Sequence, residues 1–277
     1  MPSELQTVAA TTRWTTQLPV SAMPALSLLS SQAPSFRTVV SRRGAEVGSS
    51  TQGSAVDAGG AGGASWCGES GNFTLGFDDT TVRSSGDGVL VANGLKNPYH
   101  HLFYANGYTN VPDKWEPYPA MSQPNVAMFL PLSGPLLPNQ AFAGTLLPGE
   151  VGAGPRASVD AYWFNAHSGY FGCALSGLAP CVLRVSGFRW DARLQTEVLV
   201  AEQNATLPAC PLYVDCRLRQ VVFGDGFRAL SGIQFRAYTA TAGTAGVQVA
   251  AVHMMDDVQL EWYNTSCAAG IVRMGHW

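Results

Sequence analysis

The chain has 277 residues, of which 46% are hydrophobic and 13% charged, and its formal net charge is −3. The charged fraction is about half of the ~25% found in ordinary globular proteins, and the cationic residues form no cluster, so we expect no nucleic-acid partner. No apolar run approaches the ~20 residues of a membrane-spanning helix, so no transmembrane segment is expected. The 30 glycines and 17 prolines favour short strands joined by turns over a bundle of helices.

The first 65 residues have a composition of their own. They are rich in Ser, Thr, Gly and Ala and end in the run AVDAGGAGGAS. Such a segment buries too little apolar surface to offset the entropy of ordering, so we expect residues 1–65 to be disordered. The apolar stretch SAMPALSLLSS is weak and contains a proline, so it is not a convincing signal peptide. The folded domain is therefore expected at 66–273.

From residue 66 onward the sequence alternates as strands do. In GNFTLGF, the side chains of Phe73, Leu75 and Phe77 fall on one face of an extended chain. Further strands are expected at 88–92, 126–130, 161–164, 182–190, 197–202, 217–223, 232–238, 246–252 and 253–262. Short strands in this number, separated by Gly, Pro and Asn, predict an all-β fold: an antiparallel β-sandwich of jelly-roll type.

Six cysteines and three glycosylation sequons indicate an oxidising secretory route. Cys173 with Cys181 and Cys210 with Cys216 form two local pairs, which leaves Cys67 and Cys267 to join the two ends of the domain. Six cysteines allow fifteen connectivities, and this one is preferred because it keeps the local pairs intact. The sequons begin at Asn72, Asn204 and Asn264. The alternative is a cytosolic protein with six buried thiols.

Two acidic doublets lie near the two ends of the folded region. Alternation places Asp256 of the second doublet on the inward face, and Asp79 of the first doublet as well if that strand continues far enough. The first and last strands of a jelly roll commonly pair, so the two carboxylates can meet and hold a structural calcium ion. The alternative for Asp256 is a network of backbone N–H donors.

An aromatic segment within residues 93–123 is the candidate ligand site. Sugar recognition needs flat apolar faces together with amides or carboxylates, and this segment has both. The candidate ligand-binding residues are Tyr104, Asn106, Tyr108, Trp115 and Tyr118. The alternative is that these rings pack a long loop.

No catalytic constellation emerges from the sequence. A glycosidase needs two carboxylates ~5–10 Å apart, and alternation selects no inward pair among Glu150, Glu197, Glu202 and Glu261. No GxSxG motif marks a serine hydrolase. Without a catalytic pair or triad, we expect a non-enzymatic protein.

The glycine-rich segment LPGEVGAGPRAS is expected to form a tight turn in which Glu150 pairs with Arg156.

Several long segments of the sequence resemble known protein families. GNFTLGFDD and MDDVQLEWYNTSC resemble galactose-binding-like jelly rolls, many of which are carbohydrate-binding modules. A second resemblance is to an uncharacterised domain in secreted and cell-surface proteins of filamentous fungi. It is carried by the segments NPYHHLFYANGY, LLPGEVGAGPRAS, AYWFNAHSGYFGC, FGDGFRALSGIQ and MDDVQLEWYNTSC. The resemblance implies fungal origin, secretion and a β-sandwich, and it implies no assigned activity.

These observations together predict a secreted or cell-wall-associated module that binds a cell-wall or extracellular polysaccharide without catalysis. The alternative is a structural or adhesive surface protein with no small-molecule ligand. A glycan-active enzyme is the third hypothesis. An exposed aromatic platform would favour binding, and a cleft with two facing carboxylates would favour the enzyme.

Overall fold

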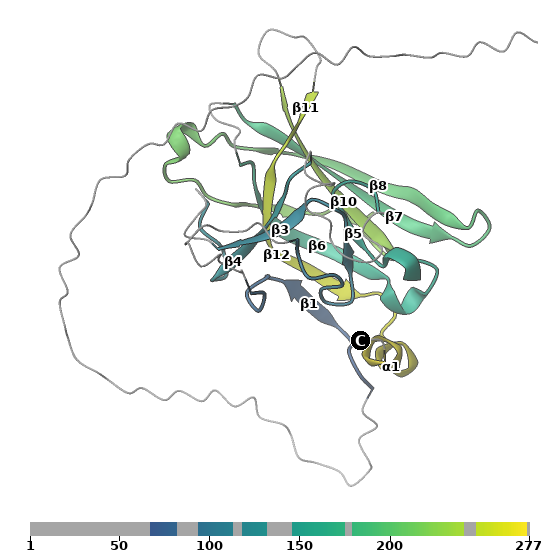
Figure 1. Ribbon diagram of the computed structural model, residues 1–277. Coiled ribbons are helices and arrows are strands. Elements are labelled where there is room, and N and C mark those ends of the chain that lie inside the picture. The colour runs from purple at the N-terminus through teal and green to yellow at the C-terminus, as the bar shows by residue number, and fades with distance from the viewer. Residues whose placement is uncertain are drawn as a thin grey trace, which may run out of the picture. The chain divides into compact units, whose positions relative to one another are not determined.

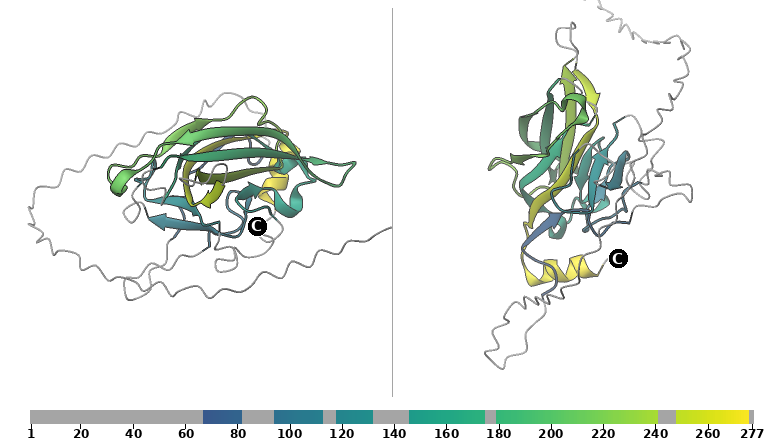
Figure 2. Two further views of the ribbon diagram at one scale, coloured as in Figure 1. Left: turned by 90° about the horizontal axis from the view of Figure 1, so that it is seen from above. Right: turned by 90° about the vertical axis from the view of Figure 1, so that its left-hand side faces the viewer.

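Two antiparallel sheets face each other in the computed structural model (Figures 1 and 2). The structure describes residues 67–81, 94–112, 118–131, 146–174, 179–240 and 248–275. This arrangement confirms the predicted antiparallel β-sandwich. The disordered segment expected at 1–65 and the strand expected at 88–92 lie outside the described residues.

Each sheet contains six strands within the described ranges. The first sheet has the order β3 (Tyr108–Pro112), β4 (Asn125–Phe129), β12 (His253–Trp262), β6 (Phe164–Gly172) and β9 (Arg219–Val222), with β1 (Asn72–Leu75) also paired to β12. The second has the order β2 (Phe103–Tyr104), β5 (Glu150–Gly152), β10 (Gly232–Ala240), β7 (Cys181–Asp191) and β8 (Thr196–Leu207), with β11 (Gln248–Ala251) also paired to β10. Short 3-10 helices occur at Gly154–Arg156, Asp160–Tyr162 and Pro211–Tyr213, and α1 spans Cys267–Met274.

A long central strand organises each sheet in the same way. Along one edge of β12, β4 pairs with its first residues and β1 with its last, while β6 occupies the other edge. Along β10, β5 and β11 share one edge and β7 takes the other. In β10, Ile233, Phe235 and Ala237 are buried at every second position, as a strand over a core requires.

The outer face of the first sheet is covered at one end only. Met254 of β12 lies in a second apolar cluster with Tyr118, Leu218 and the Cys210–Cys216 loop, so both faces of β12 are buried near its start. Toward the end of β12, Gln259 is exposed and Glu261 is half-exposed, while the residues between and beside them are buried. The uncovered half of this face is therefore polar.

Several predicted elements need correction. The range 161–164, expected as a strand, begins as the 3-10 helix at Asp160–Tyr162, and β6 starts only at Phe164. The strand expected through Phe77 ends at Leu75, and Phe77 has a positive φ of 62°. The segment 93–123 contributes β2 and β3, and α1 had no counterpart in the sequence analysis.

Three disulfides join the cysteines in the predicted pairs: Cys67–Cys267, Cys173–Cys181 and Cys210–Cys216. Three disulfides fit the oxidising conditions of an extracellular protein.

The two ends of the domain meet beside α1 (Figure 1). Arg273 of α1 is fully buried, and its guanidinium donates to the backbone carbonyls of Glu69, Asn264 and Ala161 and lies 4.7 Å from the ring centroid of Trp262. A side chain at position 270 would meet the Cys67 carbonyl oxygen at 2.0 Å, so only glycine allows this approach. Covalent, polar and steric constraints thus act together at this junction.

His253 is a buried polar residue that has no hydrogen-bond partner among the described groups. It is fully buried beside Phe129 and Tyr108, and neither ring nitrogen has a hydrogen-bond partner. Burial lowers the pKa of His253 to about 3. The imidazole is therefore neutral in the folded protein, whereas it takes up a proton in the unfolded chain below its ordinary pKa.

We expect His253→Phe to stabilise the domain, because it removes an unpaired buried N–H while keeping a flat ring. The gain in the free energy of unfolding should be about 1 kcal/mol at pH 7. It should grow by roughly 2 kcal/mol at pH 5, where only the unfolded wild-type chain binds the proton. Urea unfolding at both pH values measures this difference. A variant less stable than wild type at both values would contradict the expectation.

Candidate functional site

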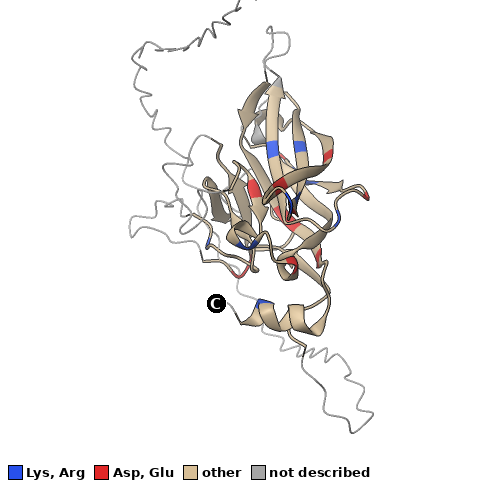
Figure 3. Cartoon of the chain, turned by 90° about the vertical axis from the view of Figure 1, so that its right-hand side faces the viewer, with Lys and Arg blue, Asp and Glu red and all other residues tan. Residues whose placement is uncertain are grey.

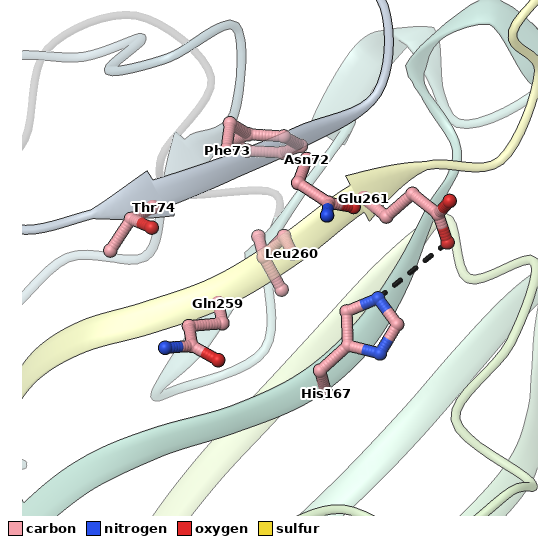
Figure 4. A pocket seen from close by; sticks show the side chains of 7 residues that line it. All are labelled: Asn72, Phe73, Thr74, His167, Gln259, Leu260 and Glu261. Carbon is pink, nitrogen blue, oxygen red and sulfur yellow. Dashed lines mark ion pairs between the residues drawn. The ribbon is translucent and has the colours of Figure 1, made fainter.

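A groove with both polar and apolar lining lies on the uncovered outer face of the first sheet (Figure 4). It has a volume of about 660 Å³, within the ~300–1,000 Å³ range of small-molecule sites. The residues that line it come from β1, β6 and β12: Asn72, Phe73, Thr74, His167, Gln259, Leu260 and Glu261. Strand alternation places the polar side chains of Asn72, Thr74, Gln259 and Glu261 on this outer face, because the residues between them on each strand point into the core.

Pairing between the first and last strands sets the positions of the groove's polar groups. Asn72 lies opposite Glu261, and Thr74 lies opposite Gln259. Directly opposed residues in an antiparallel pair have Cβ atoms about 4.5–5.5 Å apart. Two amides, a hydroxyl and a carboxylate therefore share one small area of the sheet.

Neighbouring side chains hold the groove's carboxylate and imidazole in place. Asn165 Nδ2 donates to Glu261 Oε2 at 2.9 Å, and His167 Nε2 lies 3.6 Å from the same oxygen. Arg228 Nη1 lies 3.4 Å from His167 Nδ1. Since a guanidinium only donates, Nδ1 is the acceptor in this contact, and Nε2 then carries the hydrogen that faces Glu261. The side chains of His167 and Glu261 are about one-third exposed, at 34% and 36%, so a ligand can reach them.

Gln259 is held by another residue of β6, the strand that also carries Asn165 and His167. Its Oε1 accepts from Ser168 Oγ at 3.2 Å, and Ser168 Oγ in turn lies 3.4 Å from Gln220 Nε2. The oxygen of the amide is thus fixed by the sheet. The amide as a whole faces the groove together with His167 (Figure 4).

The aromatic residues predicted to bind sugar do not form an exposed platform. Tyr104 and Tyr108 are fully buried and Tyr118 is 2% exposed. The Tyr108 hydroxyl donates to the Gly149 carbonyl, and the Tyr118 hydroxyl to the Cys173 carbonyl. These three rings pack the protein interior, so the prediction that they contact ligand is wrong for this structure. Asn106 is half-buried beside them, and Trp115 lies outside the described residues.

The predicted aspartate pair has a different arrangement from the one expected for a cation. Asp256 is fully buried, as alternation predicted; its Oδ2 accepts from the backbone N–H groups of Met121 and Ser122, and its Oδ1 from that of Asp257. Asp79 is exposed, since β1 ends before it, and it accepts from the Tyr99 hydroxyl at 2.7 Å. Burial and the neighbouring Asp257 raise the pKa of Asp256 to about 7.

These contacts correspond to the hydrogen-bond alternative for Asp256. A carboxylate saturated by three N–H donors and another engaged by a phenol are a poor donor set for calcium, which takes six to eight oxygens. Within the described ranges, no group of three or more His, Cys, Asp or Glu side chains is placed to hold a metal ion.

A second pair of carboxyl groups lies on the outer face of the other sheet, where sequence analysis selected none. A Cβ at Gly232 would lie 2.7 Å from Glu150 Oε1 and 3.2 Å from Glu197 Oε1. Glu150 is only 2% exposed, its Oε2 accepts from the Leu147 N–H, and its carboxyl group is hydrogen-bonded to that of Glu197. Burial and the nearby charge of Glu197 raise the pKa of Glu150.

The carboxyl pair bears on two of the earlier expectations. The predicted pairing of Glu150 with Arg156 is wrong, because Arg156 donates to the His101 carbonyl and lies over the ring of Tyr162. The pair also lacks the ~5–10 Å separation that a glycosidase needs, because the two carboxyl groups are in hydrogen-bond contact. Glu150 is buried as well, so a substrate does not reach both carboxyl groups in this structure.

The three predicted glycosylation positions differ in their surroundings. Asn72 is exposed on β1 at the groove, and Asn204 is exposed on β8 of the other sheet. Asn264 is half-buried before α1, where its amide donates to Asp160 Oδ2 at 3.0 Å. Glycosylation of each remains a prediction. Among the described residues, no helix combines the length and apolar character needed to cross a bilayer.

The sequence profile of one family, described as "Domain of unknown function (DUF7371)", matches residues 69–273. The chain belongs to this family. A search of curated proteins found no match to the chain. The matched range contains the twelve strands found in the described residues, and the groove, so both are features of the DUF7371 domain.

Several solved structures are similar to the DUF7371 chain at low sequence identity. A DUF4465 family protein from Bacteroides caccae is 12% identical, with a TM-score of 0.39 over 68% of this chain and 98% of its own. The K2 cleaved adhesin domain of Lys-gingipain is 12% identical, with a TM-score of 0.32 over the same shares. The CBM22-1–GH10 modules of Clostridium thermocellum xylanase 10B, complexed with xylohexaose, are 10% identical, with a TM-score of 0.29 over 61% of this chain and 28% of theirs.

The groove of the DUF7371 domain was not found from sequence, although part of its signal was present. Alternation counted from the inward Asp256 puts Gln259 and Glu261 on the outward face of the last strand, and the same period puts Asn72 and Thr74 of the first sequon on one face of the first strand. The missing information was the register that brings these faces together and the loop contacts that leave this half of the sheet uncovered.

Proposed function

We propose that the DUF7371 domain is a non-catalytic extracellular module that binds carbohydrate in the groove between β1, β12 and β6. The observation that carries this proposal is the set of positioned hydrogen-bonding groups around one hollow: the Glu261 carboxylate, the His167 imidazole and the Gln259 amide. Sugars present many hydroxyls at fixed spacing, and these groups offer both donors and acceptors to them. Charged residues are scattered among a large majority of uncharged ones along the ribbon (Figure 3), and only 13% of the chain is charged, which favours recognition by hydrogen bonds over recognition by net charge.

The proposed setting is a cell wall or extracellular matrix, and the proposed source is a filamentous fungus. Three disulfides and three sequons support secretion. The resemblance of long sequence segments to secreted and surface proteins of filamentous fungi supports the fungal source. A polysaccharide such as chitin, glucan or mannan is then the ligand that the groove meets.

A structural or adhesive role is the second candidate. The observation that favours it is the closure of the domain by Cys67–Cys267 and by the buried Arg273, which makes a constrained unit without involving the groove. A folded domain that binds no polysaccharide would favour this role over the first.

Binding to insoluble chitin, glucan and mannan tests the proposal. We expect the full chain, produced in an oxidising bacterial compartment without N-glycosylation, to bind at least one of them. Gln259→Ala combined with Glu261→Ala should weaken that binding about tenfold or more, equivalent to the loss of one or two good hydrogen bonds. Glu202→Gln, at an exposed position on β8, is the matched control and should bind as wild type does.

The same assay tests the calcium proposal. Because Asp256 is already saturated by N–H donors, binding with added calcium and with chelator should be equal. Loss of polysaccharide binding in the presence of chelator would show that a bound cation is needed for binding. Equal binding by wild type and the groove variant would overturn the groove as the site.

A further inference from the structure

Asn72 belongs both to the groove and to the glycosylation sequon Asn72-Phe73-Thr74. Residues two apart on a strand project from the same face, so a sequon on β1 presents its Asn and its Thr together. Here that face is the groove, because Asn72 is paired with Glu261 and Thr74 with Gln259. The Asn72 side chain that would carry a sugar therefore begins at a Cβ about 5 Å from the Cβ of Glu261.

We propose that an N-glycan on Asn72 occupies the groove and regulates its access to external polysaccharide. The inference rests on the proposed function, since the same groups would recognise both ligands. Its formation needs only the lipid-linked diphosphate oligosaccharide of the secretory pathway. The Nδ2–C1 bond forms, the C1–O bond to the diphosphate breaks, and the amide proton leaves with the diphosphate.

The groove has the chemistry and the room for such a glycan. The first two sugars of an N-glycan are N-acetylglucosamines, which present hydroxyls and acetamido groups. Glu261 lies directly opposite the attachment point, Gln259 lies diagonally from it, and His167 lies beyond them on β6 (Figure 4). The hollow of about 660 Å³ accommodates more than one sugar ring. Attachment to the same strand also removes the entropic cost of bringing ligand and site together.

Asn204 provides a control within the same chain. It is exposed on β8 of the other sheet, opposite Arg184, and it is not among the residues of the groove. A glycan at Asn204 is therefore attached to an equally extended strand, but outside the groove between β1, β12 and β6. A difference between the two positions then reports on the groove rather than on the strand.

Digestion of the native protein measures whether the Asn72 glycan is held. The full chain is secreted from a eukaryotic host and treated with an endoglycosidase that cuts between the first two sugars, and site-resolved mass spectrometry follows each sequon. We expect cleavage at Asn72 to be about tenfold slower than at Asn204 in the folded protein, and equal after denaturation. Gln259→Ala combined with Glu261→Ala should raise the native rate at Asn72 and leave that at Asn204 unchanged.

Polysaccharide binding then measures the regulation. The secreted protein should bind about tenfold more weakly than the unglycosylated bacterial protein. Thr206→Ala, which removes the Asn204 sequon, should not relieve this weakening. An unmodified Asn72, equal native cleavage at the two sites, or equal binding by the two preparations would overturn the inference. Failure of the bacterial protein to bind any polysaccharide would instead overturn the proposed function, because that protein carries no glycan.

Discussion

Replacing Cys67 and Cys267 by alanine is expected to lower the free energy of unfolding by about 5 kcal/mol. The two cysteines are 200 residues apart, so their bond restricts nearly the whole of the unfolded domain. In the chain-entropy description the stabilisation grows with the logarithm of the loop length. The loss is comparable to the total stability of many domains, so a large unfolded fraction is expected at 37 °C.

The local disulfide Cys210–Cys216 is the matched control for this experiment. Its sequence separation is 6, and the same description gives it only about 2 kcal/mol. Urea unfolding of the two double-alanine variants, each with the other disulfides intact, measures the comparison. Equal losses for both variants would contradict the argument from loop length and would indicate that native contacts at the junction dominate.

Glu150→Gln is expected to stabilise the domain at alkaline pH and to leave it nearly unchanged at pH 5. Burial and Glu197 raise the pKa of Glu150 above its ordinary value, so the folded protein keeps a proton that the unfolded chain has already released. Stability from this group is therefore present at low pH and is lost as the pH rises through neutrality. The loss should reach roughly 3 kcal/mol by pH 8, and a glutamine, which is never charged, avoids it.

Thermal or urea unfolding at pH 5 and pH 8 measures the effect, with Glu202→Gln as the exposed control. Part of the wild-type dependence should persist in Glu150→Gln, because the raised pKa of Asp256 acts in the same direction. His253 acts in the opposite direction below pH 6.5. The three buried groups together favour maximum stability at mildly acidic pH. A Glu150→Gln variant that loses stability with rising pH as steeply as wild type would contradict the assignment.

Local patterns in the sequence were sufficient for much of the fold. Alternation placed Asp256 on the inward face of β12, because a half-buried strand has a fixed period. The three disulfides followed from spacing. The end of β1 did not follow, since Phe77 is buried with a positive φ, a conformation that its residue type does not indicate.

The candidate site depended on contacts between residues distant in the chain. The ring of Tyr108 is buried because its hydroxyl reaches Gly149, 41 positions away, and Tyr118 likewise reaches Cys173. Composition alone does not separate such packed rings from a sugar-binding platform. Similarly, Glu150 and Glu197 approach each other over Gly232, because the missing side chain there leaves space that no strand pattern reveals.

The closure of the domain at Cys67 and Cys267 has a mechanical consequence. Tension applied between the segment before Cys67 and the C-terminal end of α1 passes through the disulfide and the helix, not through the hydrogen bonds that join β1 to β12. A covalent bond thus bears the load, and the strands between the two cysteines are mechanically shielded. The groove on β1, β12 and β6 would keep its shape while the chain is under force.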